Sequence, residues 1–122
     1  MIVDTNFLSD LHDEKIQGKG PAMQFLAKNR TREFITTVIS AGEFAVIFDH
    51  GWQAREFLKY WRILRLHLEV AYVAAQIDRE LSGQRLGEND NWIAAFCRYY
   101  GKPLVSRDEA FDRVSGLRRI EY

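Results

Sequence analysis

Acidic side chains stand at four of the points where this sequence passes from one expected element to the next. These residues are Asp4, Glu43, Asp90 and Asp108. Carboxylates brought close together repel one another, so such a cluster either raises its own pKa values or binds cations. Hard oxygen ligands favour magnesium or manganese over zinc. A divalent ion held in this way can activate a water and bind a phosphate, so the pattern predicts metal-dependent chemistry on phosphate esters.

Alternating strands and helices would bring these acids together. The expected strands are residues 1–3, 34–35, 65–68, 103–105 and 117–122, and the expected helices are 7–11, 21–29, 38–48, 52–64, 70–81, 90–100 and 111–115. This alternation predicts an α/β fold of three layers, α/β/α, around a central, mostly parallel sheet of four to five strands. Strand C-termini and the following helix starts share one edge of such a sheet. Asp4, Glu43 and Asp108 should therefore meet there, whereas Asp90 needs tertiary folding to join them.

Each acid also has a purely structural interpretation, in which it caps a helix. The three aspartates can each accept a backbone hydrogen bond as an N-cap. The segment Ser40-Ala41-Gly42-Glu43 matches a capping box, although that box would start the helix at Ala41 and leave Val38 and Ile39 outside it. The shared placement of all four acids favours a site over four independent caps.

Composition indicates one folded domain with no global attraction for nucleic acid. The chain has 122 residues, 47% of them hydrophobic, which suits a single packed core. Its 17 basic and 17 acidic residues cancel, so a polyanion must be held by a local patch or through a metal. Cys97 is the only cysteine and cannot form an internal disulfide, which fits a reducing compartment. Asp4 precedes any long apolar run, which argues against a signal peptide. We therefore expect one cytoplasmic domain, residues 1–122, without membrane association.

Four short motifs surround these acids along the chain. They are Ile2-Val3-Asp4-Thr5-Asn6, Thr37-Val38-Ile39-Ser40-Ala41-Gly42-Glu43-Phe44, Asn89-Asp90-Asn91-Trp92-Ile93-Ala94-Ala95 and Pro103-Leu104-Val105-Ser106-Arg107-Asp108. With these motifs the chain resembles the PIN domain family and, in size and layout, its toxin ribonucleases of VapC type. Phe111 and the run Val114-Ser115-Gly116-Leu117 also look like the family's closing stretch. Each motif is short, but their order and spacing together are fairly specific, and the resemblance covers nearly the whole chain.

The resemblance implies an endoribonuclease that depends on Mg²⁺ or Mn²⁺ and hydrolyses RNA phosphodiester bonds. The residues implied as its catalytic and metal-binding cluster are Asp4, Glu43, Asp90 and Asp108. Asn6 and Ser106 fall at positions where the family often has a polar residue supporting the site. The family also implies a cognate antitoxin that blocks the site, as in type II toxin–antitoxin systems, and a toxin that commonly dimerises.

Two features near the last motif stay open at this stage. Family members often carry an Asn-plus-Asp pair there, whereas Asp108 stands with Asp112 four residues on, so the role of Asp112 is open. Lys102, Arg107 and Arg113 lie close to Asp108 in sequence, with further arginines after them; they either hold RNA phosphates or form a solvated basic surface.

The aromatic residues of the segment 52–61 also have two interpretations, because they fit either a groove for an antitoxin helix or ordinary core packing. The main alternative function is a PIN-like module that has lost catalysis and only binds RNA or protein. Because all four acids are present, we rank it below the nuclease.

Overall fold

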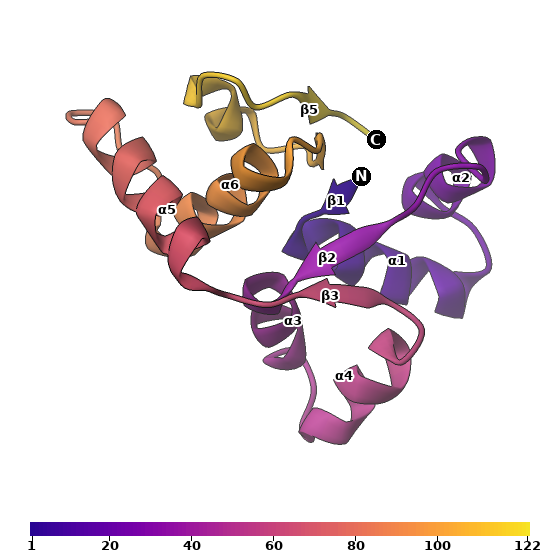
Figure 1. The fold of residues 1–122 in the computed structure, drawn as a ribbon. Helices are drawn as coiled ribbons and strands as arrows, with labels where there is room; N and C mark the ends of the chain where they lie inside the picture. Colours follow the sequence, from indigo (N-terminus) through magenta and orange to yellow (C-terminus); the bar gives the residue numbers. More distant parts are fainter.

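A five-stranded parallel sheet forms the centre of the computed structural model, which describes residues 1–122 (Figure 1). The strands are β1 (Ile2–Val3), β2 (Ile35–Thr37), β3 (Arg62–Leu64), β4 (Leu104–Val105) and β5 (Arg119–Ile120). They lie in the order β3-β2-β1-β4-β5, and every neighbouring pair is parallel. The first strand of the chain is therefore the middle strand of the sheet.

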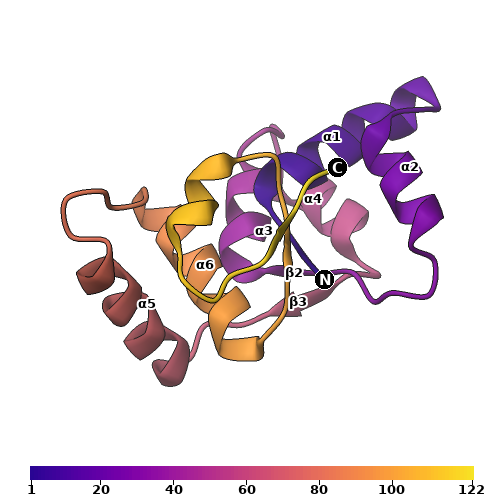
Figure 2. The ribbon, with the colours of Figure 1, turned by 90° about the horizontal axis from the view of Figure 1, so that it is seen from above.

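Helices cover both faces of this sheet. They are α1 (Thr5–Gln17), α2 (Pro21–Lys28), α3 (Val38–Ala45), α4 (Gly51–Leu58), α5 (Leu68–Glu80) and α6 (Glu88–Tyr100), followed by the 3₁₀ helix η1 (Glu109–Arg113). Seen from above, α5 and α6 lie on one side of the strands, and α1, α2 and α4 lie on the other (Figure 2). The predicted three-layer α/β/α fold is confirmed.

Successive strand residues pack into different cores. Ile2 and Leu104 belong to the core formed with α5 and α6, whereas Val3 and Val105 belong to the core formed with α1 and α2. Side chains alternate across a strand, so even a two-residue strand supplies both layers. All four side chains are fully buried, which explains why each of these short apolar runs could be recognised as a strand.

The helix predicted at residues 7–11 is longer than expected, because α1 continues to Gln17 and ends at Gly18 in a left-handed conformation. Glu14, within this extension, is buried. Its two carboxylate oxygens accept hydrogen bonds from the backbone N–H groups of Ala22 and Met23 at 3.1 and 2.8 Å. These donors lie in the first turn of α2, where N–H groups have no partner within their own helix. A tertiary contact therefore stabilises the C-terminal half of α1, which apolar spacing alone did not indicate.

We expect Gly20→Ala to destabilise this helix pair. A methyl group at Gly20 would overlap the Glu14 carboxyl group, so Glu14 would have to leave the first turn of α2. The expected cost is about 1–3 kcal/mol of unfolding free energy, measured as a lowered urea midpoint. Gly51→Ala is the matched control, because a methyl group there meets no atom within 4 Å; an equal loss in both variants would contradict this account.

The helix and the strand predicted at 52–64 and 65–68 are both present, but their predicted bounds are wrong. The helix α4 ends at Leu58, and the strand β3 occupies residues 62–64. Within β3, Ile63 and Leu64 pair in register with Thr36 and Thr37 of β2. The apolar spacing of residues 52–64 fits one continuous helix, but residues 62–64 instead form backbone pairs with β2 at the sheet edge. Another boundary differs as well: α3 ends at Ala45, short of the predicted residue 48, and Gly51 begins α4.

The aromatic residues of segment 52–61 divide between the two interpretations. Phe57 and Trp61 are partly buried against the core, as plain packing predicts. Trp52 and Tyr60 are 62% and 91% exposed and so remain available to a partner. No helix in the chain combines the length and the apolar character needed to cross a membrane.

Candidate active site

The four acids predicted from sequence line one pocket, with a volume of about 210 Å³. The complete lining is Asp4, Thr5, Asn6, Glu43, Asp90, Ile93, Asp108 and Phe111. The pocket lies where β1 and β4 end and where α1 begins, the edge at which parallel α/β sheets bind ligands. Folding thus brings Asp90 to the other three acids, which spacing alone could not establish.

Asp4 both caps a helix and faces the pocket. Its Oδ1 accepts a hydrogen bond from the Phe7 backbone N–H at 2.9 Å, as the N-cap of α1. The residue is only 5% exposed, and this burial raises the pKa of its carboxyl group, with a further increase from the nearby charge of Asp108. Hydrogen bonds from Ser106 and Phe7 act in the opposite direction. The capping interpretation is therefore correct and leaves the site interpretation intact.

Asp90 is not the N-cap that sequence allowed. The helix α6 begins at Glu88 after Gly87, so Asp90 is its third residue and lies within the first turn. Burial raises the pKa of the Asp90 carboxyl group, and the charges of Asp108, Glu43 and Asp4 raise it further. All three of the other pocket acids thus act electrostatically on Asp90, as expected for carboxylates that share one site.

Glu43 is free of the capping box that its sequence matched. The helix α3 begins at Val38 and is capped by Thr37, whose hydroxyl accepts the Ser40 backbone N–H at 3.1 Å. Glu43 therefore lies inside the helix, where its backbone needs no cap. Its carboxylate instead accepts hydrogen bonds from the side chains of Thr5 and Asn89.

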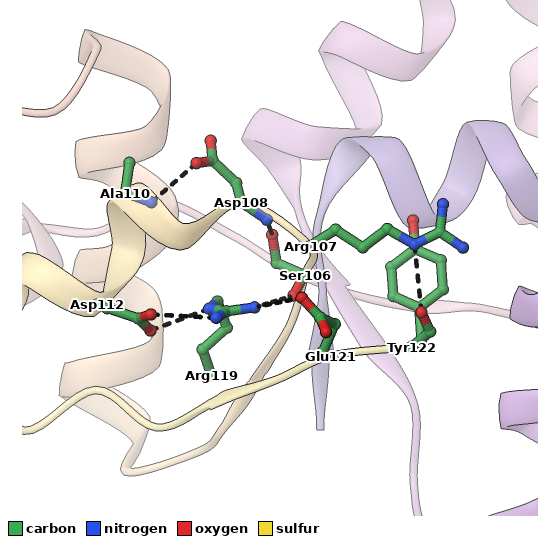
Figure 3. A network of polar contacts seen from close by, with 8 residues as sticks. All are labelled: Ser106, Arg107, Asp108, Ala110, Asp112, Arg119, Glu121 and Tyr122. Atoms are coloured by element: carbon green, nitrogen blue, oxygen red, sulfur yellow. Dashed lines mark hydrogen bonds and ion pairs between the residues drawn. The ribbon is translucent and has the colours of Figure 1, made fainter.

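Asp108 is tied to Asp4 through Ser106. The Asp108 Oδ1 accepts the backbone N–H of Ala110 at 2.9 Å, as the cap of η1, and the Ser106 hydroxyl accepts the Asp108 backbone N–H at 3.0 Å (Figure 3). The same Ser106 side chain is fully buried and lies close enough to Asp4 to lower the pKa of its carboxyl group. One serine thus links the two acids that follow β1 and β4.

Asp112 lies outside the pocket and forms an ion pair. Arg119 donates from Nε and Nη2 to its two carboxylate oxygens at 2.9 and 3.0 Å, and from Nη1 to the Ser106 carbonyl at 3.1 Å (Figure 3). The hydrogen bond from Arg119 lowers the pKa of the Asp112 carboxyl group. Asp112 thus restrains Arg119, which in turn contacts the loop carrying Asp108.

The basic residues near the last motif do not line the acid pocket. Arg107 instead lies over the ring of Tyr122, 4.2 Å from its centre, and donates from Nε to the Tyr122 carbonyl at 3.2 Å (Figure 3). Its Nη1 also contacts Asp10 at 3.5 Å. Lys102 is partly buried, and Arg113 is exposed. Contact of these residues with RNA stays a prediction, and of the three Arg107 is already occupied by protein groups.

The donor set of the pocket suits a hard divalent ion. Carboxylates, a hydroxyl and an amide line it, and no histidine, cysteine, lysine or arginine does, so the acids have no protein cation among them. No three metal-binding side chains are close enough together to form a ready-made metal cage. Mg²⁺ does not require one, because it is commonly held by one or two carboxylates and keeps several waters. The pocket thus fits Mg²⁺ or Mn²⁺ as an open site.

Comparison with known proteins decides the family. The PIN domain model matches residues 1–117. The chain belongs to the PIN domain family. No curated protein sequence matches this PIN domain.

Solved structures share the fold of this PIN domain at low sequence identity. A DNA-bound VapBC from Salmonella typhimurium has a TM-score of 0.79 at 19% identity, covering 98% of this chain and 96% of that one. VapBC-1 from nontypeable Haemophilus influenzae has a TM-score of 0.78 at 18% identity, covering 98% and 96%. A toxin–antitoxin complex from Klebsiella pneumoniae has a TM-score of 0.74 at 21% identity, covering 95% and 93%. These similarities establish the architecture of the PIN domain.

Sequence reasoning missed two polar residues of this site. Thr5 and Asn89 each adjoin a predicted acid in the chain, and both donate to Glu43. Both belong to the motifs by which the chain resembles PIN domains, but that resemblance implied no role for them. The available signal was a side-chain donor directly beside Asp4 or Asp90, and it could not reveal the partner because Glu43 is distant in sequence.

Proposed function

We propose that this PIN domain is a metal-dependent endoribonuclease, and specifically the toxin of a type II toxin–antitoxin system acting in the cytoplasm. The observation that carries the proposal is the single pocket lined by Asp4, Glu43, Asp90 and Asp108 without a lysine or arginine among them. Uncompensated carboxylates at the ligand-binding edge of a parallel sheet are costly to maintain for stability alone. A site that needs a divalent cation accounts for them.

The four acids would hold Mg²⁺ or Mn²⁺, which supplies a bound water of lowered pKa and neutralises charge on a phosphate. The protein's own contribution is to position the donors. Ser106 and the Phe7 N–H hold Asp4, and the Ala110 N–H holds Asp108. Asn6 adds an uncharged polar group to the pocket lining, suited to a phosphate, which a further carboxylate would repel.

An antitoxin is the proposed protein partner. The Klebsiella structure is by description a toxin–antitoxin complex, and together with the similarity to the VapBC structures it supports such a partner here. An apolar groove of about 380 Å³ between α3 and α4 and the exposed Trp52 offer a surface for an amphipathic helix. We also propose a homodimer, following the family. A small reading frame beside this gene that encodes a DNA-binding protein would support the toxin assignment.

A catalytically inactive module that binds RNA or protein is the second candidate. One observation favours it: no three metal-binding side chains already converge as a cage. In that case the carboxylates would repel one another without a resident cation, and the protein would bind its partner with no dependence on Mg²⁺ or Mn²⁺.

Cleavage of RNA by the purified protein separates the two candidates. We expect single-stranded RNA to be cut in the presence of Mg²⁺ or Mn²⁺, leaving 5′-phosphate and 3′-hydroxyl ends, and cutting to stop when a chelator is added. The chelated sample must recover when metal is restored, which excludes unfolding as the cause. Full activity in chelator would reject the metal mechanism, and RNA binding without cleavage in either metal would select the second candidate.

A further inference from the structure

The Glu43 carboxylate is held at both of its oxygens by side chains from two other helices. Thr5 Oγ1 donates to Glu43 Oε1 at 2.5 Å, and Asn89 Nδ2 donates to Glu43 Oε2 at 3.1 Å. Thr5 is the first residue of α1, and Asn89 is the second residue of α6. The three residues thus connect α1, α3 and α6 around a single carboxylate.

Glu43 needs such support more than two of the other pocket acids do. Asp4 and Asp108 are short side chains whose carboxylates accept backbone N–H groups at helix starts. Glu43 is longer by one rotatable bond and lies on the side of a helix, where no backbone donor reaches it. A free glutamate loses considerable rotamer freedom when it is fixed, so donors that restrain it in advance reduce the cost of using it.

The chain positions of the two donors place them well for this role. Thr5 directly follows Asp4 and Asn89 directly precedes Asp90, so any shift of either acid also moves a donor to Glu43. Both donors are uncharged and add no further negative charge to the pocket. Each bond uses one lone pair of a carboxylate oxygen, and the remaining lone pairs can still face a metal ion or its waters.

We propose that Thr5 and Asn89 are positioning residues that fix the Glu43 carboxylate relative to Asp4 and Asp90. This inference rests on the proposed function in that the positioned carboxylate serves the metal-dependent reaction. Partners that orient metal-binding carboxylates commonly change metal affinity or activity by about 10- to 100-fold when they are removed. If Thr5 and Asn89 only held the helices together, their loss would change stability, and any change in metal affinity would not depend on the presence of Glu43.

The test removes each donor while keeping its shape. Thr5→Val replaces the hydroxyl by a methyl group, Asn89→Leu removes the amide, and Thr5→Ser retains the hydroxyl. We expect Thr5→Val and Asn89→Leu to lower the affinity for Mn²⁺, measured by calorimetric titration, and kcat on an RNA oligonucleotide by about tenfold each, with KM for RNA little changed. Thr5→Ser should restore both quantities to near the wild-type values. Thr31→Val, at an exposed threonine after α2, is the matched control and should change neither.

Combination with Glu43→Ala decides whether the donors act through Glu43. In that background, Thr5→Val and Asn89→Leu should lower Mn²⁺ affinity less than about twofold, because the carboxylate they orient is gone. The same tenfold loss in the presence and absence of Glu43 would overturn the proposal. A Thr5→Ser variant as impaired as Thr5→Val would overturn it for Thr5.

Failure of the proposed function would be recognised separately. If the wild-type protein neither binds Mn²⁺ nor cleaves RNA, the nuclease assignment is rejected. The contacts of Thr5 and Asn89 with Glu43 are then tested by urea unfolding. A double-mutant cycle between Asn89→Leu and Glu43→Ala should show non-additive changes in the free energy of unfolding if the two side chains are joined. Strict additivity there, with or without nuclease activity, would overturn the proposed contact.

Discussion

Asp4→Asn is expected to reduce metal-dependent RNA cleavage by at least about a hundredfold and to leave the protein as stable as before, or more stable. The substitution removes a buried charge that burial and Asp108 disfavour. Asparagine is as good an N-cap as aspartate, so the hydrogen bond from the Phe7 N–H is retained. Loss of activity without loss of stability distinguishes a functional carboxylate from a structural one.

Asp90→Asn and Asp108→Asn should behave in the same way, and Asp112→Asn is the matched control. Asp112 has the same chemistry and lies near Asp108 in the chain, but it pairs with Arg119 outside the pocket. Asp112→Asn should affect cleavage far less, because Asp112 does not line the pocket. It should also change stability little, because ion pairs at the surface contribute little to stability. If Asp112→Asn proves as damaging as Asp4→Asn, the last acid of the site has been misassigned.

The metal-free protein is expected to become more stable as the pH falls from about 7 toward the ordinary aspartate pKa of about 4. The folded-state pKa values of Asp4 and Asp90 are raised by burial and by neighbouring acids, so the native protein binds more protons than the unfolded chain. This contribution is fully present below the unfolded-state pKa and is lost as the pH rises through the folded-state values. Asp112 has a lowered pKa and contributes in the opposite direction, but it is exposed.

Mn²⁺ should reverse this dependence on pH. The ion binds ionised carboxylates of the folded protein, so its stabilising effect grows as the pH rises. At a free concentration a hundredfold above Kd it would contribute about 2.7 kcal/mol, or a Tm increase of about 10 °C for a domain of this size. Calorimetric scans between pH 5 and 8, with and without Mn²⁺, measure both effects. The double variant Asp4→Asn, Asp90→Asn should flatten both curves, and a wild-type Tm insensitive to Mn²⁺ at every pH would favour the inactive module.

The parts of the fold that sequence predicted are those whose signal is local. Ile2–Val3 and Leu104–Val105 are short buried runs followed by acids, and this local pattern was enough to place Asp4 and Asp108 at one edge. The strand β3 was misplaced because its pairing with β2 is a tertiary choice that apolar spacing does not record. The extent of α1 was missed because Glu14 owes its place there to α2.

The same distinction separates what was predicted of the site from what was not. The carboxylates could be predicted from residue type and position, and they do line one pocket. The side chains that hydrogen-bond to Glu43 could not be predicted, because each contact joins distant parts of the chain, as between Asn89 and Glu43. The contacts of Arg107 with Tyr122 and Asp10 were likewise not indicated by the sequence, because both partners are distant in the chain; its contact with RNA stays a prediction.

The central position of β1 has a consequence for the time at which the protein becomes active during its synthesis. β1 is made first, yet one of its two neighbours is β4, so Ile2 pairs with Leu104 near the opposite end of the chain. Contacts between such distant segments form late, and domains generally complete folding as units. Until β4 and its following loop have left the ribosome, the nascent chain lacks Asp108 and the Ser106 link to Asp4. For the ribonuclease proposed above, we therefore expect cleavage of RNA to begin only after this last segment has been synthesised and has joined the sheet.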